Sequence, residues 1–313
     1  MENLFTQITG LHAYVLHVFT VGVLIAATCS LLSTYVVLRR MALISEGIAH
    51  AGFGGLGVAV VAAALIPTLQ GEISQRIITG VFCLLTALLI GYFARSRRVS
   101  EDSSIGIFLV ASVALGDLLL NVRLYLLQGM GTYRAIQPEQ LLFGDFMSVT
   151  RIDALMAVLT AGACFTLVAL FYYEFLYTTL DEEMARVNGV PTRFINVLLL
   201  LMITLVIVIG VRMVGFLMIT AMTIIPGATA TMISRRFGSV MACSLLVGTV
   251  GTLSALTLAF LTSLNRFPPG PILVITLFAI FLVVWTFRQL VKPRRAADSA
   301  SPPATPPAAP SKE

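Results

Sequence analysis

The sequence predicts an all-α integral membrane protein, a polytopic bundle of eight or nine transmembrane helices. Of its 313 residues, 58% are hydrophobic and only 11% are charged, whereas soluble domains carry about 25% charged residues. Apolar stretches that are long enough to cross a bilayer, which takes about 20 residues, recur along most of the chain. Arginines gather in alternate connections between them, so the net charge of +5 reflects membrane topology and does not indicate nucleic acid as a partner.

Length and apolar composition place the individual helices. The N-terminal segment has no basic region and no cleavage site, so we expect it to lead uncleaved into the first span. The sixth and seventh stretches are separated only by Val214, and in the eight-span alternative one of them is short or re-entrant. In chain order the candidates are 13–38, 42–66, 76–94, 103–127, 152–173, 194–213, 215–233, 239–263 and 271–288.

The arginines predict the orientation of these helices. Connections that are rich in Lys and Arg face the cytoplasm. This rule places the N-terminus outside and the C-terminus in the cytoplasm, and every connection agrees, which supports nine spans. The rich connections carry Arg39, Arg40, Arg95, Arg97, Arg98, Arg186, Arg193, Arg235 and Arg236, and the C-terminal end adds Arg288, Lys292, Arg294 and Arg295. The intervening connections carry only Arg76, Arg134, Arg151, Arg212 and Arg266.

The chain divides into one large domain and a tail. Residues 1–290 are expected to form a single transmembrane domain, and the Pro, Ala and Ser content of 291–313 predicts a disordered cytoplasmic tail. Two connections are long enough to do more than turn, 128–151 outside and 174–193 inside. The cysteines lie in apolar runs without a C-x-x-C pair, which argues against a disulfide framework or a zinc knuckle.

An ionisable pair lies within the second apolar stretch. Glu46 and His50 are four residues apart, and an α-helix places positions i and i+4 on one face. Ionisable groups are costly inside a bilayer and mark substrate or ion pathways. The pair offers one oxygen and one nitrogen ligand to a divalent metal. The alternatives are a polar gate without metal ligation, or hydrogen bonds to each other and to nearby backbone.

Other polar or helix-breaking residues in the spans receive structural interpretations. Asp117 is expected to pair with Asn121 or Arg123 and so to stabilise the fourth span. Pro226 and Gly227 interrupt the seventh stretch. Such interruptions are tolerated where neighbouring protein satisfies the freed backbone groups, so we expect these two residues to shape the helix.

The long inner connection contains the pattern D-x-E-x-A-x-x-x-G, formed by Asp181, Glu183, Ala185 and Gly189. A short helix that ends at Gly189, with Pro191 following, has ordinary stop signals. Its small residues would allow another protein to approach closely. The alternative is an interfacial helix that only joins two spans.

The ordered set of motifs resembles the membrane permeases of the zinc, manganese and iron ABC importers. The short-helix pattern is similar to the coupling segment with which such permeases dock on an ATPase, although Met184 replaces one alanine. The likeness spans most of residues 15–288. It is carried by LLSTYVVLRRMALISEGIAHAGFGG (31–55), LLFGDFMSVT (141–150), LDEEMARVNGVP (180–191), VGFLMITAMTIIPGATATMISRR (214–236) and NRFPPGP (265–271).

The resemblance implies a type II ABC importer fold and gives Glu46 and His50 a role. In the family the pair usually reads Asp-x-x-x-His, so Glu46 lengthens the carboxylate arm by one methylene. Two permease chains surround one pathway, and two identical copies of this chain would bring two carboxylates and two imidazoles together. That set suits Zn²⁺ or Mn²⁺, with Fe²⁺ as a further option.

The resemblance also implies partners and a location. A permease of this family works in the bacterial cytoplasmic membrane with cytoplasmic ATP-binding subunits, with a second permease chain as a homodimer, and with an extracytoplasmic protein that delivers metal. Residues 181–189 would pass movement of the ATPase to the spanning helices. The transported ion is the cargo, and no permanently bound cofactor is expected.

Missing motifs narrow the function. The chain has no G-x-x-x-x-G-K-[ST] loop, so ATP hydrolysis is expected on a separate chain, and no H-E-x-x-H or comparable catalytic motif, so we expect a transport subunit and not an enzyme. Two alternatives remain. One is an ABC permease for siderophores, haem or cobalamin, and the other is a proton-coupled secondary metal transporter.

Overall fold

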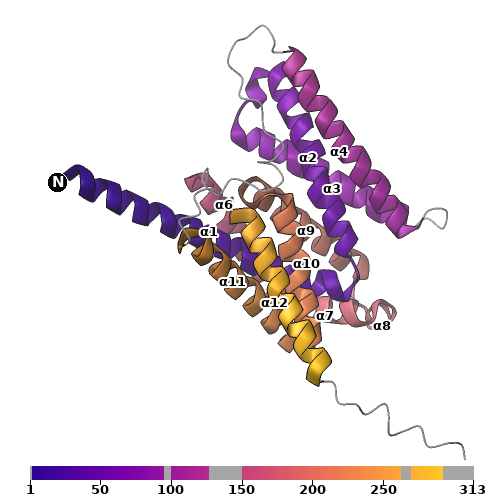
Figure 1. Cartoon of the computed structure of the whole chain (residues 1–313). Coiled ribbons are helices and arrows are strands. Elements are labelled where there is room, and N and C mark those ends of the chain that lie inside the picture. The colour runs from indigo at the N-terminus through magenta and orange to yellow at the C-terminus, as the bar shows by residue number, and fades with distance from the viewer. Residues whose placement is uncertain (1, 95–99, 127–149, 262–268, 292–313) are drawn as a thin grey trace, which may run out of the picture.

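The computed structural model describes residues 2–94, 100–126, 150–261 and 269–291, and these are helical almost throughout (Figure 1). Within these ranges, nine helices are long and apolar enough to cross a membrane. The predicted all-α multi-pass architecture is therefore confirmed, and the described part of the chain favours nine spans over eight. The LLFGDFMSVT motif up to Val149, most of NRFPPGP and the tail beyond residue 291 lie outside the described residues.

The observed helices follow the predicted stretches closely. They are α1 (Glu2–Leu38), α2 (Ala42–Leu65), the short 3-10 helix η1 (Pro67–Leu69), α3 (Glu72–Ala94), α4 (Glu101–Leu126), α6 (Arg151–Leu170), α7 (Tyr172–Leu180), α8 (Glu182–Val187), α9 (Thr192–Val214), α10 (Phe216–Ile233), α11 (Phe237–Leu261) and α12 (Pro269–Val291). Two boundaries differ: α1 begins well before residue 13, and the predicted 152–173 helix ends at Leu170.

The break between α9 and α10 falls on Gly215, one residue after the predicted one. Its backbone has φ +85° and ψ 158°, a region that a residue with a Cβ rarely adopts. The Gly215 N–H makes the last hydrogen bond of α9, and its carbonyl accepts the first hydrogen bond of α10. A single glycine is therefore enough to end one helix and start the next. The Gly215 N–H donates to Val211 O at 2.8 Å, and Ile219 N–H donates to Gly215 O at 3.1 Å.

Helices α2, α3 and α4 pack closely through glycines (Figure 1). A Cβ added to Gly54 would lie 2.7 Å from the Ser112 carbonyl oxygen on α4, and one added to Gly57 would lie 3.0 Å from the Cα of Gly116. Small residues at these positions allow two backbones to approach, which is how helices associate in a bilayer. The glycine-rich half of α2 is therefore the surface on which its neighbours pack.

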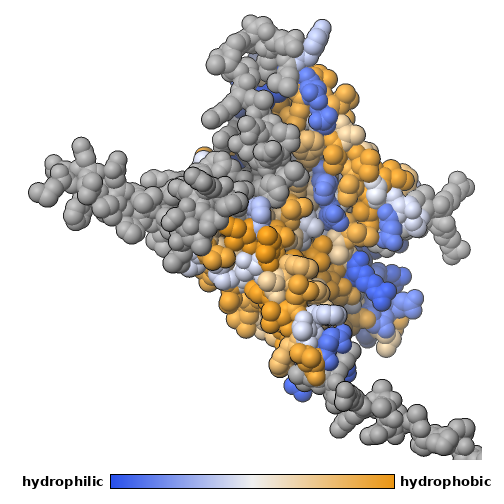
Figure 2. Space-filling model, viewed as in Figure 1, coloured by the Kyte–Doolittle hydropathy of each residue, from blue (hydrophilic) through white to orange (hydrophobic). Residues whose placement is uncertain are grey.

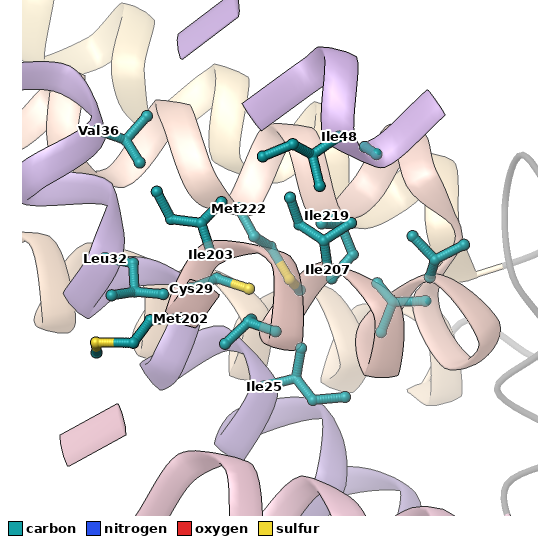
Figure 3. Close-up of a cluster of buried hydrophobic side chains, with 14 of the residues drawn as sticks. Ile25, Cys29, Leu32, Val36, Ile48, Met202, Ile203, Ile207, Ile219 and Met222 are labelled. Atoms are coloured by element: carbon teal, nitrogen blue, oxygen red, sulfur yellow. The ribbon is translucent and has the colours of Figure 1, made fainter. Parts of the chain in front are cut away.

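The main core joins α1, α9 and α10, with α11 and α12 packed against α10. Figure 3 shows its side chains interdigitating between helices that are far apart in sequence. The labelled members are Ile25, Cys29, Leu32, Val36, Ile48, Met202, Ile203, Ile207, Ile219 and Met222, all of them buried. All four cysteines are free thiols, as the spacing predicted. Figure 2 shows apolar side chains over most of the visible described surface, as expected for a lipid-facing protein.

Candidate functional site

Glu46 and His50 lie one turn apart on α2, and both side chains are half-buried. The remaining faces of α2 are buried against α3, α4, α9 and α10. Within the described part of the chain, the Glu46 carboxylate makes no hydrogen bond and no ion pair. The helix thus presents a carboxylate and an imidazole together on a face that is only partly covered by its neighbours.

One ring nitrogen of His50 is held by the backbone. The Nδ1 atom lies 3.0 Å from the carbonyl oxygen of Glu46, and since a carbonyl only accepts hydrogen bonds, Nδ1 carries the proton in this contact. The neutral ring then has its lone pair on Nε2, the nitrogen that can bind a metal ion. Metal-binding histidines are commonly oriented by such a bond from their other nitrogen. The hydrogen-bonding alternative and the ligand interpretation are therefore compatible.

Phe216 covers the imidazole from another helix. The ring centroid of Phe216 is 5.8 Å from that of His50. Phe53 contacts the Phe216 ring edge-on, at a centroid distance of 6.3 Å. Phe216 is the first residue of α10, directly after Gly215, so the conformation of that glycine fixes where its ring lies. Nothing in the local sequence of α2 indicated this contact.

A cleft between α2, α3, α9 and α10 reaches the other side of Phe216. Its lining is mostly apolar, with three polar side chains from α3. The lining residues are Gly52, Leu56, Gln75, Arg76, Thr79, Val208, Val211 and Phe216. Phe216 lines this cleft and also contacts the imidazole of His50.

An ion pair at the edge of this cleft joins α3 to α6. The Arg76 guanidinium bonds to Asp153, and both side chains are about nine-tenths buried. The other carboxylate oxygen of Asp153 accepts from the backbone N–H of Thr150 at 2.9 Å and from its hydroxyl at 2.7 Å, a capping box at the start of α6. The T-x-x-D spacing is a recognisable helix-start signal, although the partner on α3 is not visible in it.

No complete metal site exists within one described chain. Across residues 2–94, 100–126, 150–261 and 269–291, no three side chains from His, Cys, Asp or Glu are grouped so as to hold a metal ion. Closed zinc sites use four ligands, whereas α2 supplies two. Glu46 and His50 on α2 are therefore two side chains and not a closed zinc site.

The D-x-E-x-A-x-x-x-G pattern forms helix α8 and its caps. The Asp181 side chain accepts from the N–H groups of Glu183 and Met184, both at 3.0 Å. At the other end Gly189 has φ +79°, its N–H bonds Arg186 O and that of Val190 bonds Ala185 O, which is a Schellman motif. Asp181 and Gly189 therefore define the helix ends, and Ala185 is its fully buried contact.

The opposite face of this segment is apolar and exposed. Met184 and Val187 are 59% and 81% exposed, and their i, i+3 spacing places them on one side of α8. Leu180, the last residue of α7, is 67% exposed just before it. Figure 2 shows hydrophilic residues gathered around the place where Figure 1 puts α8. Apolar side chains within a polar surrounding are typical of a site that contacts another protein.

The freed backbone group at Pro226 finds a partner on α1. Pro226 lies inside α10, and the N–H of Gly227 donates to the Ser33 hydroxyl at 2.8 Å. A Cβ on Gly227 would lie 2.6 Å from that hydroxyl oxygen.

On α4, the Asn121 side chain donates to the Asp117 carboxylate at 3.4 Å, on a face that is exposed in the single chain. Both contacts agree with the structural interpretations of these residues.

Comparisons with known proteins agree with the fold and the motifs. The chain matches the ABC 3 transport family over residues 11–288. It is 31% identical over 290 residues to the manganese transport system membrane protein MntC of Halalkalibacterium halodurans, with 92% of each chain covered. It is 33% identical over 273 residues to a "Probable metal transport system membrane protein" of Thermotoga maritima, covering 86% of this chain and 88% of that one. Its fold is similar to that of PsaBC from Streptococcus pneumoniae in complex with Fab, with a TM-score of 0.74, 25% identity, and 91% and 95% of the two chains covered.

Proposed function

This chain belongs to the ABC 3 transport family, and from that premise we propose that it is the membrane permease of an ATP-driven importer of divalent transition-metal ions. The observation that carries the proposal is the imidazole of His50, whose Nδ1 is held by the Glu46 carbonyl at 3.0 Å while Nε2 remains available. The relatives named for manganese and for metal transport support the same cargo class. Mn²⁺ and Zn²⁺ both suit mixed nitrogen and oxygen ligands.

Two copies of the chain would complete the ion site. If the α2 helices of two permeases face each other across a two-fold axis, two Glu46 carboxylates and two His50 imidazoles meet at one point. Each chain contributes two ligands, and the half-buried position of both side chains leaves them accessible to a partner. Ligands divided between two subunits separate when the subunits move, so such a site can release the ion that it has bound.

Energy would come from a separate ATP-binding subunit. The exposed face of Leu180, Met184 and Val187 is an apolar docking surface of the kind that protein partners use. The capped ends at Asp181 and Gly189 keep α8 short and rigid, and buried Ala185 holds it against the permease. In this arrangement the helix faces the cytoplasm, the N-terminus lies outside, and an extracytoplasmic protein delivers the metal to the outer end.

The proposal sets the location as the bacterial cytoplasmic membrane. The nine membrane-length helices of the described residues make the chain a multi-pass membrane protein, with residues 1–290 as the permease domain and 291–313 as a cytoplasmic tail. A permease for a large chelate needs a wide pathway and no metal ligands. The Glu46 and His50 pair therefore favours a bare ion.

The test is transport by the reconstituted assembly. The full chain is produced with its candidate ATP-binding subunit, purified through a tag on that subunit and placed in liposomes with the delivery protein. Uptake of Mn²⁺, Zn²⁺ and Fe²⁺ is measured one ion at a time, with and without ATP. ATP-dependent uptake of at least one of these ions supports the proposal, and copurification without uptake of any of them contradicts it.

A further inference from the structure

A polar chain of contacts joins α8 to the turn that precedes α2. The Glu182 carboxylate accepts from the Asn196 side-chain amide at 3.3 Å. The Asn196 carbonyl oxygen, in turn, accepts from the Arg39 guanidinium at 2.5 Å. These residues come from α8, from the first turn of α9 and from the turn after α1, and 157 positions separate Arg39 from Asn196. No local sequence pattern indicates that these residues meet.

The partners fix the direction of the Asn196 amide. Its oxygen can only accept and its nitrogen can only donate, so the oxygen faces the cation and the NH₂ group faces the anion. Arg39 remains charged under all ordinary conditions. Its partial burial lowers its pKa, and the charge of Glu182 opposes that shift. The amide therefore bridges two opposite charges, and neither end can be reversed without losing both bonds.

Arg39 is close to α2 along the chain and in a tight turn. Arg40 has φ +57°, its N–H bonds Val37 O at 3.1 Å, and the N–H of Met41 bonds Val36 O at 2.8 Å. This Schellman arrangement uses an arginine where glycine is usual. Only Arg40 and Met41 separate Arg39 from the start of α2, so a displacement of Arg39 moves the end of the helix that carries Glu46.

Glu182 makes a second contact, within α8. Its carboxylate also accepts from Arg186 at 3.3 Å, but that pair lies at the surface, where ion pairs contribute little. The bond from Asn196 is therefore the contact that ties Glu182 to another helix. Arg193 offers a matched control, because it is exposed at the start of α9, three residues before Asn196, and lies outside the coupling segment 181–189.

We propose that Glu182, Asn196 and Arg39 form the link through which movement of α8 reaches α2, and with it Glu46 and His50. The inference rests on the proposed function, in which α8 docks on the ATPase. Glu182, Asn196 and Arg39 would transmit the movement from that docking surface to the ion site. Glu182 and Asn196 are positioning residues, because they would contact neither the ATPase nor the ion.

The experiment measures uptake and ATP hydrolysis separately in the reconstituted permease–ATPase complex. The variants are Glu182→Ala and Asn196→Leu, with Arg193→Ala as the matched control. We expect metal uptake per ATP hydrolysed to fall about tenfold in the first two, within the usual range of coupling effects. Copurification of the ATPase and basal hydrolysis remain at wild-type levels in all three. The double variant should lose no more than either single one, because both remove the same contact.

A conservative substitution separates coupling from simple folding. Arg39→Lys keeps a charged donor for Asn196 and should retain most of the coupling ratio, whereas Arg39→Leu should lose it as Glu182→Ala does. The link is wrong if Glu182→Ala and Asn196→Leu couple normally, if Arg193→Ala loses as much, or if Glu182→Ala fails to copurify with the ATPase. A wild-type complex that moves no metal would instead contradict the proposed function itself.

Discussion

The ring of Phe216 lies against the imidazole of His50 at a centroid distance of 5.8 Å, although the two residues belong to different helices. Phe216 also lines the cleft between α2, α3, α9 and α10. One ring therefore contacts both the imidazole on α2 and the cleft between the helices. Its position depends on Gly215, whose backbone turns the chain from α9 into α10.

Replacing Gly215 with alanine should therefore destabilise the protein. A Cβ at φ +85° costs about 1–2 kcal/mol, and the junction can relieve the strain only by moving Phe216. We expect a lower thermal unfolding midpoint in detergent. Gly162→Ala is the control, since that glycine is exposed on α6 and has open space around it. Equal unfolding midpoints for Gly215→Ala and Gly162→Ala would show that a Cβ at position 215 causes no strain.

Ser33→Ala should remove the partner of a buried backbone donor. The Gly227 N–H bonds the Ser33 hydroxyl at 2.8 Å, and leaving such a group unsatisfied costs about 1–3 kcal/mol. Denaturant titration in detergent measures the loss. Thr257→Ala is the comparison, because its exposed hydroxyl bonds only Leu253 O within the same helix. A loss of stability no greater than that of Thr257→Ala would mean that the Gly227 N–H has another hydrogen-bond partner.

The sequence predicted features that depend on neighbouring residues, and it missed contacts between helices that are far apart in the chain. Apolar length placed the helices, and the spacing of Glu46 and His50 placed both on one face, because these features depend on helix geometry alone. The contact of Phe216 with His50 depends on tertiary packing between helices that are far apart in the chain, so no local pattern contains it. Asp181 illustrates the intermediate case: the motif that contains it was recognised, but its local contact is a helix cap.

One predicted helix was divided for a local reason that composition did not show. The stretch 152–173 was expected to be continuous, but Phe171 adopts φ −105° and ψ 29°, which ends α6 and starts α7. Both sides of the junction are apolar, so hydropathy alone sees one span. The change of direction lets α7 lead into α8, with buried Phe175 packed against Tyr35 at 5.3 Å.

Asp153→Ala should destabilise the protein more than loss of a surface ion pair. The change leaves the mostly buried Arg76 guanidinium without this carboxylate and also removes the capping box of α6. Removing one partner of a buried pair costs about 3–5 kcal/mol. Arg186→Gln serves as the surface control, because its pair with Glu182 is exposed and should contribute about 0.3–0.5 kcal/mol. Similar unfolding free energies for both variants would show that the α3–α6 pair is not important for stability.

Charge on the apolar face of α8 should weaken binding of the ATP-binding subunit. Met184 and Val187 are among the most exposed apolar residues of this segment, and an interface core excludes charged groups. We expect Met184→Glu and Val187→Glu each to raise the dissociation constant about tenfold or more. The measurement is titration of the ATP-binding subunit onto the permease in nanodiscs, with Arg193→Gln as the control, because Arg193 is exposed and lies outside 181–189. Unchanged affinity in both glutamate variants would place the docking surface elsewhere.

The central claim is that His50 contacts the moving ion, and uptake by a His50→Ala complex tests it most directly. The complex is reconstituted beside wild type, and uptake of the metal that wild type transports is measured together with ATP hydrolysis and ATPase copurification. Because alanine has no nitrogen ligand, we predict uptake at the level of protein-free liposomes, with assembly and basal hydrolysis unchanged. Uptake at the wild-type rate would contradict the account.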